Sequence, residues 1–389
     1  MNYILFDDAK WSDLLPLTFT RPACEIRIGI LTIKEKWELR LKKDFSYICP
    51  IYLAEKFPYH ANEKQTTIYA NGRVCPDDSL IKEINKIKPS QALYKDDILL
   101  AYCTSNPDES FIDFTKIQSK TKGTILNFPW DIFKNNGAEL ETDFTLLTKG
   151  RKSKPLSKSN KVIGKGKIFI ESGASVECVI FNTQGGSIYI GKDAVVMEGC
   201  LIRGGFALCE HSEVKMGAKI YGPTTIGPHS KVGGEISNSV IFGYSNKGHD
   251  GFLGNSVLGE WCNLGADTNN SNLKNNYAEV KAYNYTQHKM ISTGLQFCGL
   301  IMGDHSKTGI NTMLNTGTVV GVSANIFGGG FPSTHVPSFS WGGAEKIEKY
   351  EINKAFEVAE RVMERRGITL TDADKEILKE VLKRTSNSK

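Results

Sequence analysis

Aliphatic residues return every six positions through the middle of the chain. The repeat passes through Ile190, Val196, Ile202, Leu208, Val214, Ile220, Ile226 and Val232. An α-helix does not fit this spacing, because six residues are not a whole number of 3.6-residue turns and the apolar stripe would drift around the helix. A unit of one short strand and one tight turn does fit, and three such units form one coil of a hexapeptide β-helix. The pattern therefore predicts stacked coils with aliphatic ladders inside a narrow prism.

Small residues accompany this repeat at a fixed offset. They stand four positions after most of the aliphatic residues, at Ala194, Cys200, Ser212, Ala218, Thr224 and Ser230, with Phe206 as the exception. A strand period of two would not place small residues at one fixed offset, whereas a strand followed by a turn does. The offset therefore supports the same six-residue unit.

The repeat is interrupted twice. Coils begin near Val162, the register is lost after Val232, and it returns briefly before breaking again at Asp267. It resumes toward Ile326. Breaks in a repeat array map to loops that leave one face, and such loops commonly carry function. We therefore expect functional loops at 243–254, where His249 stands among glycines, and at 267–299, which is rich in Asn and Lys.

The regions on either side of the repeat have a different character. At 1–148, short apolar runs alternate with helical segments, which favours an α/β domain with a mostly parallel, covered sheet. The basic, polar stretch at 149–161 indicates an exposed linker. The β-helix is expected at 162–342.

The remaining residues, 343–389, form a tail with helical spacing of apolar residues. One helix is expected over 344–366, where Gly367 ends it, and a second is expected from Thr371 onward. Such a pair would cover the open end of the β-helix or an adjacent subunit. Its basic residues fit either a solvated face or contacts with coenzyme phosphates.

Composition and charge narrow the class of protein further. The net charge of +5 is spread along the chain, which favours a pocket for phosphorylated ligands over a nucleic-acid partner. Nine cysteines without metal spacing indicate reduced thiols and a cytoplasmic protein. Asp7 and Asp8 stand where a signal peptide would need an apolar run, and no long apolar stretch follows, so we expect no membrane insertion.

The segment after the first strand carries a candidate nucleotide-binding motif. Residues 15–22, Leu-Pro-Leu-Thr-Phe-Thr-Arg-Pro, resemble the second half of the signature of sugar nucleotidyltransferases. In that family a glycine-rich loop brings bare backbone N–H groups to triphosphate oxygens. Here the glycines are replaced by Phe-Asp-Asp-Ala-Lys-Trp at 6–11. Lys10, Arg21 and Arg27 remain as candidates for holding phosphates.

A second departure concerns the metal. Arg73 follows Asn71-Gly72 where the family usually carries a metal-binding aspartate, although Asp77 and Asp78 lie close by in the sequence. A cation at that position would repel Mg²⁺. Two interpretations remain open: a degenerate nucleotidyltransferase fold kept for packing or for binding a nucleotide sugar, and a domain that still transfers nucleotides with Mg²⁺.

The interruptions of the repeat carry a more specific resemblance. His249 with Phe-Leu-Gly at 252–254, Asn-Leu-Gly-Ala-Asp-Thr at 263–268, Asn-Leu-Lys at 272–274 and Thr-Gly-Ile-Asn at 308–311 resemble the acetyltransferase half of the GlmU-like bifunctional enzymes. The archaeal bifunctional sugar-1-phosphate nucleotidyltransferase–acetyltransferases are closer still. The resemblance implies a left-handed parallel β-helix, a homotrimer and active sites between neighbouring prisms.

The resemblance also assigns roles to individual residues. His249 matches the general base, a role for which imidazole titrates in the right range. Asn272 matches a catalytic-site asparagine that contacts the sugar, and Asn263, Lys281 and Phe252 match substrate-binding positions. Ile310 and Gly328 fall where the family lines the acetyl-CoA groove.

Three residues depart from the family pattern. Phe252 replaces a tyrosine, Ser237 replaces a phosphate-binding lysine, and Asp267 replaces a glycine. The first two remove contacts to a sugar phosphate, so the acceptor need not be glucosamine 1-phosphate. His305, next to Asp304, is the rival candidate for the base.

These observations predict an acetyl-CoA-dependent acyltransferase that acts on a sugar 1-phosphate or a nucleotide sugar. It is fused to a sugar nucleotidyltransferase-like domain. One alternative is a bifunctional enzyme that also forms the nucleotide sugar from NTP and sugar 1-phosphate, and only then is Mg²⁺ required. The other alternative is a non-catalytic trimeric scaffold that binds nucleotide sugars.

Overall fold

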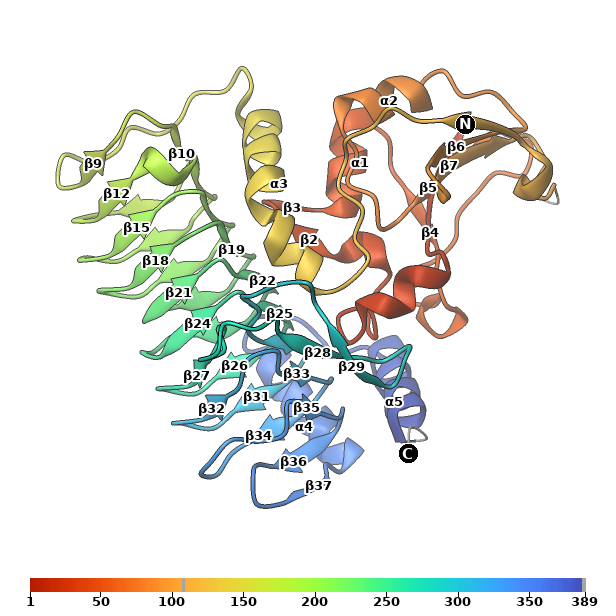
Figure 1. Cartoon of the computed structure of the whole chain (residues 1–389). Helices are drawn as coiled ribbons and strands as arrows, with labels where there is room; N and C mark the ends of the chain where they lie inside the picture. Colours follow the sequence, from red (N-terminus) through yellow and green to blue (C-terminus); the bar gives the residue numbers. More distant parts are fainter. Residues whose placement is uncertain (107–108, 387–389) are drawn as a thin grey trace.

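The computed structural model describes residues 1–106 and 109–386. An α/β domain, a parallel β-solenoid and two C-terminal helices lie against one another (Figure 1). The fold class is the one expected, and the stacked parallel coils are consistent with a left-handed β-helix. Within the described residues, no helix is long and apolar enough to cross a membrane.

The N-terminal domain is built on one mixed sheet with the order β4-β1-β5-β7-β6-β8. Its strands are β1 (Asn2–Phe6), β4 (Ser46–Ile48), β5 (Thr67–Asn71), β6 (Gln91–Lys95), β7 (Ile98–Thr104) and β8 (Thr115–Gln118). Its helices are α1 (Ile33–Leu41) and α2 (Asp78–Ile84). The sheet is mostly parallel, as expected, and only β7 runs antiparallel to its neighbours β5 and β6. Only two residues join β6 to β7, and so short a hairpin loop makes the strands antiparallel.

Three sheets form the walls of the solenoid. The first contains β10 (Ile168–Ile170), β13 (Ile188–Ile190), β16 (Phe206–Leu208), β19 (Thr224–Ile226), β22 (Val240–Gly243), β25 (Val257–Glu260), β30 (Ile301–Met302), β33 (Val319–Val320) and β35 (His335–Val336). The second contains β11 (Ser175–Val176), β14 (Val195–Val196), β17 (Glu213–Val214), β20 (Lys231–Val232), β23 (Asn246–Lys247), β26 (Asn263–Leu264), β31 (Lys307–Thr308), β34 (Asn325–Ile326), β36 (Ser340–Gly342) and β37 (Ile347–Lys349). The third contains β9 (Lys161–Ile163), β12 (Ile180–Asn182), β15 (Leu201–Arg203), β18 (Lys219–Tyr221), β21 (Glu235–Ser237) and β24 (Phe252–Gly254), and the pair β27 (Asn269–Asn270) and β32 (Met313–Leu314) continues next to it.

The first break in the six-residue register is not a loop. Val214 pairs with Val232, 18 positions on, but Val232 pairs with Lys247 after only 15. The turn from β20 to β21 is short, and β23 and β24 continue the coil through 243–254. The coils therefore keep stacking although the six-residue period is lost. The loop expected at 243–254 is wrong, because these residues form part of a coil.

The second break does leave the solenoid. After β27, the chain forms an antiparallel hairpin of β28 (Lys281–Asn284) and β29 (Lys289–Ser292) that is directed toward the N-terminal domain (Figure 1). The ring of Tyr285 meets Phe19 edge-on at 5.1 Å, and Val280 and Ala282 are buried in the same apolar cluster as the core of that domain. The interruption therefore joins the two domains.

The C-terminal tail begins as a strand rather than as a helix. β37 pairs antiparallel with β36, and the helices are α4 (Ile352–Glu364) and α5 (Asp372–Ser386). Met363 packs with Trp261 of the solenoid, while Leu378 packs with Phe19 and Leu53 of the N-terminal domain. The helices lie along the side of the coils and not over their open end.

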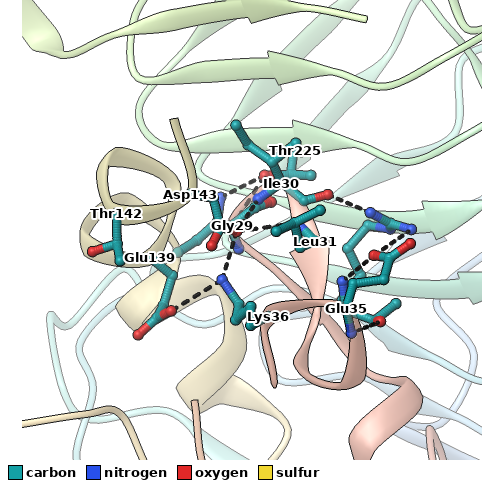
Figure 2. A network of polar contacts seen from close by, with 12 residues as sticks. Gly29, Ile30, Leu31, Glu35, Lys36, Glu139, Thr142, Asp143 and Thr225 are labelled. Carbon is teal, nitrogen blue, oxygen red and sulfur yellow. Dashed lines mark hydrogen bonds and ion pairs between the residues drawn. The ribbon is translucent and has the colours of Figure 1, made fainter. Parts of the chain in front are cut away.

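A buried polar network fastens the N-terminal domain to the coils (Figure 2). It connects α3 (Trp130–Thr148), the hairpin of β2 (Arg27–Ile28) and β3 (Leu31–Thr32), and β19. Lys36 Nζ lies 2.5 Å from Asp143 Oδ2 and 3.0 Å from Glu139 Oε2. Asp143 Oδ2 also accepts the backbone N–H of Ile30, at 2.8 Å.

Gly29 completes the network. Its N–H donates to Asn136 Oδ1 at 2.8 Å, and its carbonyl accepts the Thr225 hydroxyl of β19 at 2.7 Å. The residue has φ +74°, and an added Cβ would lie 2.5 Å from Asp143 Oδ2, so only glycine fits. Burial would lower the pKa of Lys36, but Asp143 and Glu139 hold it above its ordinary value, so the lysine is charged.

We predict that Asp143→Ala destabilises the chain by about 3–5 kcal/mol, because the Lys36 ammonium is then buried without its nearest partner. Urea unfolding measures this loss. Lys379→Ala breaks an exposed ion pair with Glu376 and serves as the control, at about 0–1 kcal/mol. The double variant Lys36→Met/Asp143→Leu should regain much of the stability. Equal losses in Asp143→Ala and the control would contradict the prediction.

Candidate functional site

A cleft of about 700 Å³ lies between the second sheet of the solenoid and the end of α4. Its back wall is a column of outward side chains on successive strands. Lys231 pairs with Asn246, Asn246 with Asn263, and Asn263 with Lys307. Every second residue of a strand points outward, so stacking places these polar groups above one another. Val362, Arg365 and Arg366 from the C-terminal end of α4 and the residues after it line the opposite side.

Stacked rings border the cleft at the corner between the first and second sheets. His211, His229, Tyr244, Trp261 and His305 occupy equivalent turns in successive coils, and neighbouring planes lie within 9–16° of parallel. Tyr244 and Trp261, with ring centroids 4.3 Å apart, line the cleft. Because each of the two rings is stacked between its neighbours in the column, they present ring edges to the cleft beside the polar back wall.

His249 stands on the opposite edge of the cleft. It is the second residue of the turn that follows β23, and Ala266, Ile310 and Gly328 are the second residues of the equivalent turns in the next coils. An added Cβ on Gly265 would lie 2.6 Å from the backbone of Gly309, which shows how closely these turns stack. His249 and Ile310 are exposed, and both line the cleft together with Asn263.

The charged side chains that line the cleft in the described chain are cations. Lys215, Lys231, Lys307, Arg365 and Arg366 line it, and the residues that line it in the described chain include no Asp or Glu. Glu213 stands behind two of them, 2.5 Å from Lys215 Nζ and 2.8 Å from Lys231 Nζ. Burial lowers the pKa of the Lys307 ammonium, which donates to the His305 carbonyl at 2.9 Å. Such a field attracts ligands with several negative charges.

Two predicted residues lie together on the adjacent face. Asn272 donates from its side chain to Asn255 Oδ1 at 2.8 Å. A Cβ on Gly254 would lie 2.6 Å from Asn272 Nδ2 and 2.5 Å from the Phe252 ring. Phe252 and Asn272 therefore meet beside Gly254. They do not line the cleft that contains His249.

Lys281 and Gly328 lie apart from these two groups. Lys281 is the exposed first residue of β28, at the base of the hairpin directed toward the N-terminal domain. Gly328 continues the turn edge beyond Ile310, with no atom within 4 Å of an added Cβ. Within one chain, the structure therefore brings His249, Asn263 and Ile310 together, and it leaves Lys281 and Gly328 outside that cleft.

Arg21 and Arg27, predicted to bind nucleotide phosphates, have protein partners at the domain junction. Arg21 forms ion pairs with Asp304 and with Glu260 of the solenoid, the latter at 3.3 Å, and it is 5% exposed. Arg27 donates to the carbonyls of Phe242 and Ile30. Lys10 is exposed and lies 3.1 Å from Asp13 Oδ2. Lys10 is thus the most accessible of the three.

The place of the missing glycine loop is taken by a 3-10 helix, Ala9–Leu14, with Asp8 as its N-cap. Arg73 Nε and Nη2 donate to the two carboxylate oxygens of Asp8 at 2.8 and 2.6 Å, and Arg73 is 1% exposed. Burial alone would raise the pKa of Asp8, but Arg73 outweighs it and holds that pKa low.

The neighbouring carboxylates are also engaged. Asp77 caps α2 through the N–H of Leu80 at 2.8 Å, and Asp78 pairs with Arg40. Across the described residues, no group of three or more His, Cys, Asp or Glu side chains is arranged to hold a metal ion. Asp8, Asp77 and Asp78 are thus each paired within the protein.

His305 differs from His249 as a candidate base. Its Nδ1 atom is buried and has no hydrogen-bond partner in the described chain. Burial lowers the pKa of His305 to about 3, with Lys307 adding to the effect. A histidine with so low a pKa is a weak base at neutral pH. The exposed imidazole of His249 is better placed to exchange protons with a ligand.

Sequence reasoning missed the aromatic stack and most of the cationic wall. Tyr244, Trp261, Lys215, Lys231 and Lys307 come from separate coils, and they converge only because the coils stack. The six-residue register could have placed Lys215 and Lys231 on the same wall, since Lys215 follows Val214 and Lys231 precedes Val232 of the aliphatic repeat. Beyond Val232 the shortened turns remove that signal.

The fold and the cleft define the class of protein: a parallel β-solenoid with a histidine at the edge of a cationic cleft, joined to a nucleotidyltransferase-like domain. Residues 3–152 match the family model for sugar nucleotidyl transferase. This match confirms the resemblance expected for the N-terminal domain.

The similar curated proteins are named as bifunctional proteins, and one of them is named for both a nucleotidylyltransferase and an acetyltransferase activity. The chain is 32% identical over 146 residues to the bifunctional sugar-1-phosphate nucleotidylyltransferase/acetyltransferase of Sulfurisphaera tokodaii, which covers 37% of this chain and 36% of that protein. It is 30% identical over 214 residues to the bifunctional protein GlmU of Methanocaldococcus jannaschii, covering 52% and 45%. It is 26% identical over 150 residues to GlmU of Trichodesmium erythraeum, covering 38% and 27%. The matches confirm the predicted resemblance, and each spans less than half of the relative's own length.

We predict that stability falls on acidification partly through His305. Because its folded pKa lies below the ordinary value of about 6.5, the unfolded chain binds more protons between pH 6.5 and 3. Its contribution is therefore present above pH 6.5 and is lost as the pH falls. Urea unfolding measures the free energy of unfolding at pH 7 and at pH 5. The decrease between the two pH values should be smaller in His305→Phe than in the wild type, by up to about 2 kcal/mol.

His60→Gln, at an exposed loop position, is the control and should keep the wild-type pH dependence. An identical dependence in His305→Phe and the wild type would contradict the prediction.

Proposed function

We propose that the chain is an acetyl-CoA-dependent acetyltransferase that acts on the amine of an amino-sugar phosphate or nucleotide sugar. The observation that carries the proposal is His249, exposed at the edge of a cleft lined by five cations and no carboxylate within the described chain. The similarity to the Sulfurisphaera tokodaii protein, whose name includes an acetyltransferase activity, supports it. Both co-substrates of such a reaction carry phosphate groups, which suits the sign of this field.

In the proposed reaction, the His249 imidazole accepts a proton as the acceptor amine attacks the thioester carbonyl. An N–C bond forms and a tetrahedral intermediate follows. The C–S bond then breaks, and the coenzyme A thiolate leaves with the electron pair and takes up a proton from the imidazolium. Tyr244 and Trp261 contribute apolar ring edges to the cleft, and Arg365 and Arg366 are placed to meet the phosphates of the coenzyme.

The active assembly is proposed to be a homotrimer. Ile180 and Leu201 are exposed neighbours on the outward face of the third sheet, and Met216 and Ile310 are exposed on the adjoining turns. Apolar surface of this kind is suited to a second copy of the chain. A neighbouring copy at this edge would add residues to the cleft beside His249. It would also lie close to Phe252 and Asn272 on the adjacent face.

We expect His249→Ala to lower kcat for acetyl transfer by about 10²–10⁴-fold with a small change in KM for acetyl-CoA, because a base acts in the transition state. The assay follows release of the coenzyme A thiol with a panel of amino-sugar phosphates. His60→Ala, an exposed histidine of the N-terminal domain, is the matched control. Unchanged turnover in His249→Ala, or no turnover with any acceptor, would reject the proposal.

Nucleotidyl transfer by the N-terminal domain is a second candidate function, favoured by the family match over residues 3–152. The Asp8–Arg73 pair weighs against its Mg²⁺-dependent form. We expect no pyrophosphate release above background when the protein is incubated with UTP or dTTP, sugar 1-phosphates and Mg²⁺. Release that depends on Mg²⁺ would overturn this expectation and support a bifunctional enzyme.

A further inference from the structure

Lys247 occupies an interior position that belongs to aliphatic residues in the neighbouring coils. Val176, Val196, Val214 and Val232 precede it in one column, each paired with the next. Lys247 is 1% exposed and is among the largest fully buried side chains of the chain. A valine would fit this column without desolvating a charge, so packing alone does not explain the lysine.

The ammonium of Lys247 is directed to the turn that carries His249. Nζ donates to the His249 carbonyl at 2.7 Å and to the Asp250 carbonyl at 3.1 Å. The Asp250 carbonyl also accepts the N–H of Asp267, at 3.0 Å. The His249 carbonyl has the ammonium as its only donor among the described residues. One side chain therefore fixes two successive peptide units next to the imidazole.

This turn differs from its equivalents in neighbouring coils. Elsewhere the fourth turn residue is small and buried, as at Cys200, Ala218, Thr268 and Thr312. Here it is Gly251, which has no side chain to fill the corner. The positive φ has also moved, from the third position in turns such as that of Asp267 (φ 54°) to the fourth, at Gly251 (φ 111°). The turn therefore lacks the packing that holds the others, and Lys247 supplies a substitute.

We propose that Lys247 is a positioning residue that holds the turn 248–251 in the conformation that presents His249 to the cleft. This inference rests on the proposed function. Burial lowers the pKa of Lys247 to about 8, while Asp250 and Asp267 oppose that shift. The side chain is therefore still mostly protonated at pH 7 and donates to both carbonyls.

The test compares Lys247→Met, which keeps the length of the side chain and removes its donors, with Lys247→Arg, which keeps charge and donors. Val196→Met places the same residue in the same column in another coil and controls for perturbed packing. We expect Lys247→Met to lower kcat at least 10-fold with KM within about 3-fold, and Lys247→Arg to recover part of the loss. Val196→Met should keep kcat within 2-fold whatever its stability.

A second measurement does not depend on activity. The amides of Glu235 and Asp267 donate to the carbonyls of Gly251 and Asp250, so their hydrogen exchange reports on the turn. We expect both to exchange at least 10-fold faster in Lys247→Met and to remain unchanged in Val196→Met.

The outcomes separate this inference from the proposed function. If His249→Ala abolishes turnover while Lys247→Met retains the wild-type kcat, the positioning role is overturned, whatever the exchange rates. If the wild type transfers no acetyl group, or His249→Ala retains full turnover, the proposed function fails. Exchange at Glu235 and Asp267 then still decides whether Lys247 holds the turn, and unchanged rates would overturn that as well.

Discussion

In-register stacking of the coils is the constraint on which the rest of the structure depends. The solenoid strands are two to four residues long, and none could persist without the coil before and after it. The same stacking that closes the aliphatic interior lines up the outer features. It sets Lys231, Asn246 and Asn263 in one column, the rings of Tyr244 and Trp261 in another, and His249 and Ile310 along a third. The cleft is therefore a by-product of a repeating scaffold, and its solenoid wall is built from residues of several successive coils.

Charged residues have different roles at the domain junction and in the cleft. At the junction of the domains, Lys36 with Asp143 and Arg21 with Asp304 join elements that are distant in sequence. Ion pairs of this kind add little net stability over apolar packing, but the loss of one partner leaves the other charge buried and unpaired. In the cleft, by contrast, five cations line an open space, and Glu213 behind them pairs with two of them, Lys215 and Lys231. The basic residues thus divide into those that join the domains, such as Lys36 and Arg21, and those that line the cleft.

The sequence predicts the solenoid, its turn-edge residues and the two-part organisation, because interior positions and short motifs are both visible in one dimension. It does not predict the course of the chain where turns shorten. Residues 243–254 lose their period although β23 and β24 keep stacking, and the aromatic stack from His211 to His305 crosses that break. Nor does it predict that Arg21 pairs with Asp304 or that Arg27 donates to Phe242, since these partners lie more than 200 positions away along the chain. Lys247 is the clearest case: it is an ordinary lysine in the sequence and becomes exceptional only when its column is known to be apolar.

The segment between α3 and β9 is the natural place to divide the chain into two domains. Cutting there would not separate their apolar cores. Residues from both sides of it, from Trp37 and Phe133 to Phe242 and Val257, belong to one continuous apolar cluster. The C-terminal helices add a further bond across the same junction, with Lys56 held 2.8 Å from Asp374. A single cut in the linker would leave two fragments that stay associated. The two domains are thus held together by their shared apolar core and not by the peptide linker.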